Sequence, residues 1–252
     1  PWSTGQPKVQ AAYDWAKVGE HWAFQPVLKG TPPIVEGAQQ PNAIDQFVAA
    51  RRQAAGLPEP SPASAPVFVR RVFIGLIGMT PSPEELLQWT TKLGGAEAKA
   101  LNSQGVAALI DHLLARPQYG ERWARHWLEV ARYSDTGGWT QDNRAKPNAW
   151  QYRDWVVRAF NEDLPFNDFV RQQIVGDQLG YLAAAGTGFF SLGPTYTSDG
   201  GDPESVAQAK SETLDDRVDT FSRAFLGLTL ACARCPDHNF DPIPTQDYYS
   251  IA

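Results

Sequence analysis

The sequence predicts a mainly α-helical protein, an irregular helical domain with an extended N-terminal arm and long loops. After residue 66, apolar residues recur three and four positions apart through most of the chain, which places them on one side of a helix. The alternation of β-branched and polar residues that is typical of half-buried strands is nearly absent. We therefore expect helices to dominate from residue 66 onward.

The N-terminal quarter has a different composition from the rest. Residues 1–41 are rich in turn-forming residues and predict an irregular arm, and 57–66 contain four prolines, which predict an extended surface linker. Between them, Asn42 is a suitable N-cap and Gly56 a suitable stop for a short helix. We expect two parts: residues 1–65 as arm, short helix and linker, and residues 66–252 as the helical domain.

The helical domain contains clear helix signals in order along the chain. Ser82 followed by Pro83 and two glutamates is typical of a helix start. An apolar stripe from Val106 to Leu114 predicts a helix, which Pro117 should stop. Further helices are expected at 120–133, 148–163, 166–176 and, as the longest, 203–232, with a long loop at 180–202.

Composition and charge limit the classes of partner. The chain has 252 residues, 42% of them hydrophobic, and a net charge of −6. A non-specific nucleic-acid binder needs excess Lys and Arg to neutralise phosphates, so nucleic acid is not expected as a partner. The longest apolar runs fall well short of the roughly 20 residues that a transmembrane helix needs, so we expect no membrane span in this chain.

An acidic face follows the predicted longest helix. Glu212, Asp216, Asp219 and Arg223 recur at helical spacing, on a different face from the apolar stripe that includes Val218. Such a face is commonly a solvated surface. The alternative is that these carboxylates face other elements, such as the loop that contains Asp135, where they would hold a cation or the hydroxyl groups of a substrate.

The two cysteines form a single Cys-x-x-Cys motif, Cys232 to Cys235, with His238 three residues beyond. At this spacing two sulfurs can bond to each other, bind one metal ion together with the imidazole, or attach one haem. Haem attachment normally requires His directly after the second cysteine, and Pro236 at that position has no ligand atom. Three interpretations stay open: a disulfide or dithiol, a metal site, and a haem site.

Several motifs in the chain, taken together, resemble one family. They are HWAFQPV (21–27), YGERWARHWLEVARYSDT (119–136), PNAWQYRDWV (147–156), DDRVDT (215–220) and FLGLTLACARC (225–235). In this order they resemble the planctomycete cytochrome-like domain of unknown function, the second of two cytochrome-named domains in large secreted planctomycete proteins. The resemblance extends from about residue 21 to the last residue.

The resemblance implies an extracytoplasmic location, periplasmic or secreted, and a longer parent protein whose other domains are partners. Members of the family usually read Cys-x-x-Cys-His-Asp-His-x-x-Asp-Pro, and this chain matches the pattern except for Pro236. The cytochrome name implies haem c, bound through Cys232, Cys235 and His238. Pro236 in place of the axial histidine argues against conventional attachment.

Three functions are consistent with these observations, and the sequence leaves enzymatic activity open. The first is a cytochrome-like module in redox or electron transfer, with Cys232, Cys235 and His238 as its cofactor or disulfide site. The second is a metal-assisted carbohydrate-active enzyme or sugar-binding domain, with polysaccharide as partner and a divalent cation held by Asp135, Glu212, Asp216, Asp237, His238 and Asp241. The third is a structural accessory subunit of an assembly.

Overall fold

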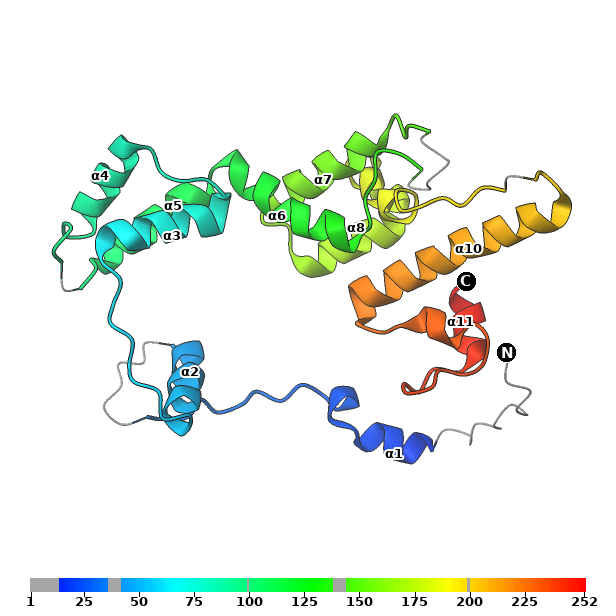
Figure 1. Cartoon of the computed structure of the whole chain (residues 1–252), viewed down its shortest axis with the longest axis horizontal. Coiled ribbons are helices and arrows are strands. Elements are labelled where there is room, and N and C mark those ends of the chain that lie inside the picture. The colour runs from blue at the N-terminus through cyan, green and yellow to red at the C-terminus, as the bar shows by residue number, and fades with distance from the viewer. Residues whose placement is uncertain (1–13, 36–41, 99, 138–143, 199) are drawn as a thin grey trace.

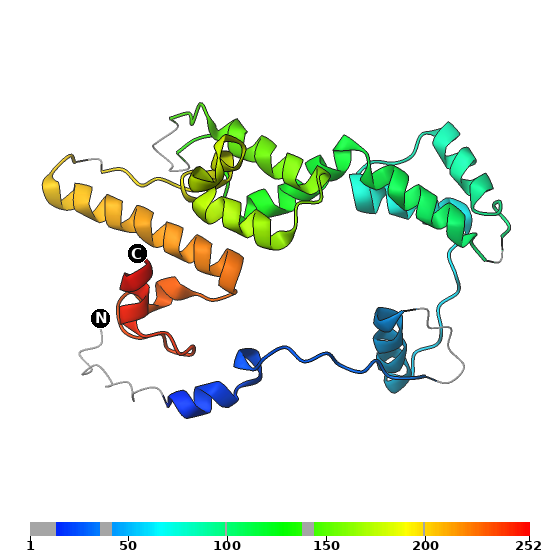
Figure 2. The same cartoon turned by 180° about the vertical axis from the view of Figure 1, so that it is seen from behind.

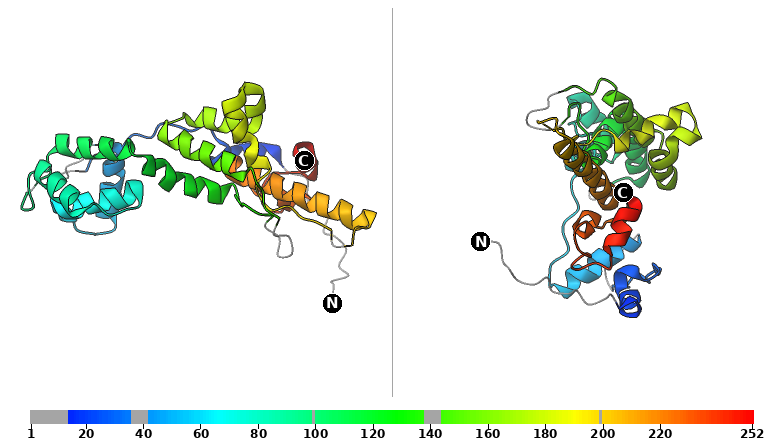
Figure 3. Two further views of the ribbon diagram at one scale, coloured as in Figure 1. Left: turned by 90° about the horizontal axis from the view of Figure 1, so that it is seen from above. Right: turned by 90° about the vertical axis from the view of Figure 1, so that its right-hand side faces the viewer.

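A computed structural model describes residues 14–35, 42–98, 100–137, 144–198 and 200–252. The predicted mainly α fold is confirmed. Every regular element in the described residues is helical, and the β-structure recorded there is an isolated bridge between Thr136 and Ala145. The view from above shows an elongated arrangement, with α3–α5 at one end and α10 at the other (Figure 3).

The helices follow one another in the order drawn in Figure 1, some of them joined by long connections such as 131–148 between α6 and α7. They are α1 (Trp15–Glu20), η1 (Trp22–Phe24), α2 (Ala43–Ala54), α3 (Ala65–Ile77), α4 (Pro83–Lys92), α5 (Ser103–Leu114), α6 (Pro117–Val130), α7 (Ala149–Asn161), α8 (Phe166–Leu179), α9 (Tyr181–Ala184), η2 (Ala185–Phe190), α10 (Pro203–Phe221), η3 (Ser222–Leu226), η4 (Leu230–Ala233) and α11 (Thr245–Ile251).

Two of the predicted helix starts have the expected capping geometry. The side chain of Asn42 accepts a hydrogen bond from the Asp45 amide at the start of α2. Ser82 and Glu85 form a capping box at the start of α4: the Ser82 hydroxyl accepts from the Glu85 amide, and the Glu85 carboxylate accepts from the Ser82 amide. These bonds satisfy amides that have no partner within the helix.

Replacing Ser82 with alanine removes the hydroxyl half of this capping box. We expect Ser82→Ala to lower the free energy of unfolding by about 1 kcal/mol, because the Glu85 amide loses its acceptor. Ser64 is the matched control, since it occupies the N-cap of α3 without a side-chain capping bond. Urea unfolding of both variants checks the prediction; an equal effect of Ser64→Ala and Ser82→Ala would contradict it.

Several predicted boundaries are wrong. Pro117 does not stop the preceding helix, because α5 already ends at Leu114; it opens α6, where its missing N–H costs nothing. The longest helix does not reach Cys232. It ends at Phe221 and passes through the π-helical turn η3 to Gly227, whose left-handed conformation (φ 67°) breaks the helix. Segment 180–202 is not one loop, since it contains α9 and η2.

Within the described ranges, the interior consists of three separate apolar clusters. The largest joins α6, α7, α8 and η2 around Tyr152, Trp155 and Phe169, and the second joins α3, α4 and α5 around Phe73. The third lies between α10, η4 and α11 around Tyr248. The predicted apolar stripe of α10 is therefore divided: Phe221 and Phe225 pack on the first cluster, Val218 and Leu228 belong to the third, and Leu214 is exposed.

The N-terminal part lies apart from the row of helices α3–α8 (Figures 1 and 2). Residues 25–35 and 57–64 have no regular structure, as the sequence predicts, and 1–13 and 36–41 of the predicted arm lie outside the described residues. Helix α2 exposes Ile44, Phe47 and Val48, and the arm exposes Val27 completely. The arm therefore contributes little to the three clusters and does not position the candidate site.

Candidate functional site

The acidic face of α10 is directed towards the end of α6, and this decides between the two interpretations of its sequence. Asp216 and Asp219 are each only 9% exposed, so neither belongs to a solvated surface. Glu212, one turn earlier, is half-buried and accepts a hydrogen bond from Gln208. Burial of two carboxylates costs free energy unless they are paired.

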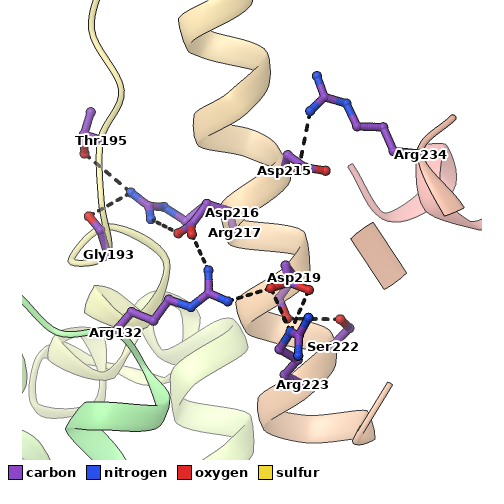
Figure 4. A network of polar contacts seen from close by, with 10 residues as sticks. All are labelled: Arg132, Gly193, Thr195, Asp215, Asp216, Arg217, Asp219, Ser222, Arg223 and Arg234. Atoms are coloured by element: carbon purple, nitrogen blue, oxygen red, sulfur yellow. Dashed lines mark hydrogen bonds and ion pairs between the residues drawn. The ribbon is translucent and has the colours of Figure 1, made fainter. Parts of the chain in front are cut away.

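Arg132 provides that pairing from the end of α6 (Figure 4). Its Nη1 atom contacts Asp216 Oδ1, and its Nη2 atom donates to Asp219 Oδ2 at 2.6 Å. The carboxylates thus face Arg132, three residues before the expected Asp135. Arg132 has a left-handed backbone conformation (φ 53°) just after α6, at a position where glycine is usual. The guanidinium is held there at the expense of backbone strain.

Two more arginines complete the network. Arg217 Nη1 lies 3.1 Å from Asp216 Oδ2, and Arg223 Nε lies 2.8 Å from Asp219. Each carboxylate therefore lies between two guanidinium groups. Burial alone would lower the pKa of Arg132, but its bonds to Asp219 and Asp216 raise that pKa overall, and Arg132 is fully charged. The three arginines therefore neutralise the buried carboxylates of the acidic face, and this requires no metal ion.

A cavity of about 270 Å³ adjoins this network and extends to the cysteine segment. Its lining combines charged residues with one tyrosine and one alanine: Arg132, Tyr196, Glu212, Asp215, Asp216, Asp219, Arg223 and Ala231. Ala231 directly precedes Cys232. The buried ion pairs and the Cys-x-x-Cys motif therefore belong to one region of the molecule.

The cysteines lie on a helical turn that follows η3. Cys232 belongs to η4, and Arg234 continues the turn with helical dihedral angles (φ −64°, ψ −37°). Because residues three apart on such a turn share a face, we expect Cys232 and Cys235 to lie on one side of it. Both thiols are free and exposed. Arg234, between them, anchors the turn to α10 through Asp215 (3.5 Å) and Ser211 (2.7 Å).

His238 is the third residue of the predicted cofactor site, and both of its ring nitrogens form hydrogen bonds within the protein. The ring is buried, and Nδ1 accepts from the amides of Phe240 (3.2 Å) and Asp241 (2.7 Å). Because an acceptor nitrogen has no proton, Nε2 is protonated and donates to the Thr229 hydroxyl at 3.0 Å. His238 therefore fastens the loop after the cysteines to the segment before them.

The six residues predicted for a cation lie in separate places. Glu212 and Asp216 are on α10, whereas Asp135 accepts a hydrogen bond from Tyr133 at 2.5 Å in the loop after α6. Burial and this bond raise the pKa of Tyr133 to about 12, so Tyr133 is neutral and donates. In the third place, Asp237 accepts from the Thr245 amide and the Asp241 carboxylate lies 3.6 Å from His238 Nε2.

These positions do not form a ligand cluster. In the part of the chain that the structure describes, no three His, Cys, Asp or Glu side chains are grouped as ligands of one metal ion. None of the described helices has the length and apolar character that a membrane crossing requires.

Comparison with family models gives a match over residues 43–252, to PSCyt2, a protein of unknown function (DUF1549). The match covers most of the chain. The chain belongs to the PSCyt2 family. Comparison with curated proteins and with solved structures gives no match.

The PSCyt2 match begins at the first residue of α2 and contains every residue of the candidate site. The family has no assigned function, so its cytochrome-like name identifies no chemistry by itself. The planctomycete source and the position as the second of two cytochrome-named domains stay predictions of the sequence. The site must therefore be interpreted from its own geometry.

Proposed function

We propose that this PSCyt2 chain is an extracytoplasmic helical module whose redox group is the dithiol of Cys232 and Cys235. The observation that favours it is the pair of free, exposed cysteines three residues apart, Cys232 on η4 and Cys235 two residues beyond its end. The turn is fixed on both sides, by Arg234 to α10 and by His238 to Thr229, the residue just before η4. A fixed turn with accessible thiols suits thiol–disulfide exchange with another protein.

The exchange needs a partner protein with a disulfide. The thiolate of one cysteine attacks that disulfide, forms a mixed disulfide and releases one partner thiol. The second cysteine then attacks the mixed disulfide, which closes the Cys232–Cys235 disulfide and releases the second partner thiol. The partner gains two electrons and two protons, and this chain loses the same. Run in reverse, the module oxidises a dithiol partner.

The residues do not fit haem c with His238 as axial ligand. Iron binds a nitrogen with a free lone pair, whereas Nδ1 of His238 accepts two amide hydrogens and Nε2 is protonated towards Thr229. Asp216 and Asp219 fit a divalent cation equally poorly, because each of these two carboxylates already lies between two arginines. The first fact favours the dithiol over haem, and the second favours it over the metal-assisted alternative.

The dithiol proposal predicts a defined redox equilibrium. The full chain is equilibrated in buffers with increasing ratios of oxidised to reduced glutathione, acid-quenched and alkylated for mass analysis. We expect a single transition from two alkylated thiols to none, with loss of two hydrogens, because residues three apart on a turn can bond.

Cys232→Ser and Cys235→Ser are the matched controls, since each leaves one thiol and permits only a mixed disulfide with glutathione. Two separate glutathione additions on the unmodified chain, without an intramolecular disulfide at any ratio, would contradict the proposal.

A further inference from the structure

A second cavity, of about 570 Å³, lies between α6, the end of α7 and the start of α8. Its walls are mainly aromatic, and their rings come from three helices: Tyr119, Trp127, Phe160, Phe166 and Phe169. Phe166 is 66% exposed, although burial of a phenylalanine side chain is favourable. No residue of the dithiol site lines this cavity.

The aromatic walls offer ring surfaces rather than hydrogen bonds. The indole N–H of Trp127 donates to Tyr152 (3.0 Å) and Gln173 (2.9 Å), so its polar group is already satisfied in the interior. Phe169 meets the Trp127 ring edge-on at 4.9 Å between ring centres. The face of an aromatic ring has a negative electrostatic potential, so a space lined by several aromatic residues suits a cation.

Asp163 is the only charged residue among those that line this cavity. It follows α7 at the position that glycine usually takes, with a left-handed conformation (φ 49°), and the Leu164 amide closes the turn on the Ala159 carbonyl. In the described residues the Asp163 side chain has neither a hydrogen-bond partner nor an ion-pair partner, and it is exposed. A carboxylate is thus held beside the aromatic walls at a position where it costs backbone strain.

We infer that this cavity is a binding site for an organic ammonium ion with an apolar body. The rings of Trp127, Phe160 and Phe166 contact the methyl or methylene groups next to the nitrogen, and Asp163 neutralises the positive charge. Apolar burial, cation–π attraction and one carboxylate act on the same ligand. An anionic ligand is disfavoured by Asp163, and an uncharged one loses both electrostatic contributions.

Calorimetric titration of the full chain with choline tests this inference, with the carbon isostere of choline as the uncharged probe. We expect choline to bind in the millimolar range or tighter, and at least about fivefold more tightly than the isostere. Asp163→Gly should weaken choline binding by a similar factor, because it removes the carboxylate while glycine suits the backbone. Its melting temperature, at or above that of the unmodified chain, verifies that the fold is intact.

Asp168→Asn is the matched control. Asp168 lies on α8, two residues beyond Phe166, pairs with Arg171 and does not line the cavity, so its substitution should leave choline binding unchanged. Phe166→Ala provides a second variant and should weaken binding of choline and isostere together. Absence of choline binding, equal affinity for the isostere, or full binding by Asp163→Gly would each overturn the inference.

Discussion

Arg132→Gly is expected to lower the free energy of unfolding by about 3 kcal/mol, the largest effect among the substitutions considered. Arg132 bridges Asp216 and Asp219, whose side chains are 8% and 12% exposed. Without it, two buried carboxylates keep one arginine each, Arg217 and Arg223. Glycine relieves the strained backbone at this position, which stabilises the chain by up to about 1 kcal/mol. This gain is smaller than the stability lost with the ion pairs. Urea unfolding measures the difference.

Asp163→Gly is the control, because Asp163 has the same left-handed conformation after a helix but no buried partner. We expect its free energy of unfolding to stay the same or to rise by up to about 1 kcal/mol. If the two glycine substitutions change the free energy of unfolding in opposite directions, the ion pairs, rather than the backbone, determine the effect at Arg132. Equal changes in both variants would contradict the structural role of the network.

Gly120→Ala is expected to destabilise the chain by about 2 kcal/mol, although alanine is the better helix former. A Cβ atom at position 120 of α6 would lie 2.4 Å from the Val157 carbonyl oxygen of α7 and 2.6 Å from the Asn161 side chain. The Gly120 amide also donates to Asn161 Oδ1 at 2.8 Å. The two helices therefore approach each other closely at Gly120. They must separate to admit a methyl group, and the largest apolar cluster loses packing.

Gly75→Ala in α3 is the matched control. It lies within a helix, and a Cβ atom there would meet no atom within 4 Å. Alanine should therefore stabilise the chain by about 0.5–1 kcal/mol through helix propensity alone. Thermal unfolding compares the two variants; a stabilised Gly120→Ala would mean that α6 and α7 are not in close contact.

Local sequence signals predicted the helices well, because caps and apolar spacing act within a few residues. Asn42 and Ser82 start their helices as expected, since an N-cap bond needs only the next turn. The end of α10 was misjudged because apolar residues continue past Gly227, and the left-handed glycine outweighs the pattern. Pro117 is predicted to stop α5 but instead begins α6, since proline is favourable in the first turn of a helix.

The candidate site could be predicted only in part. The spacing of Asp216 and Asp219 places both on one face, but the partner is Arg132, 84 and 87 residues away in sequence. Such a contact follows from packing, and no local pattern reveals it. An available signal was that the long motif 119–136 contains several arginines beside the expected helix end. The hydrogen bonds of His238 likewise depend on how the loop folds back on Thr229.

A dithiol at Cys232 and Cys235 excludes covalent haem at the same sulfurs. The deciding experiment is the intact mass and absorption spectrum of the full chain produced in a host that attaches haem c. We expect a polypeptide of unmodified mass, without a Soret band, in which both cysteines are alkylated after reduction. A haem joined by thioether bonds to Cys232 and Cys235, with its Soret band, would show that the pair is not a dithiol.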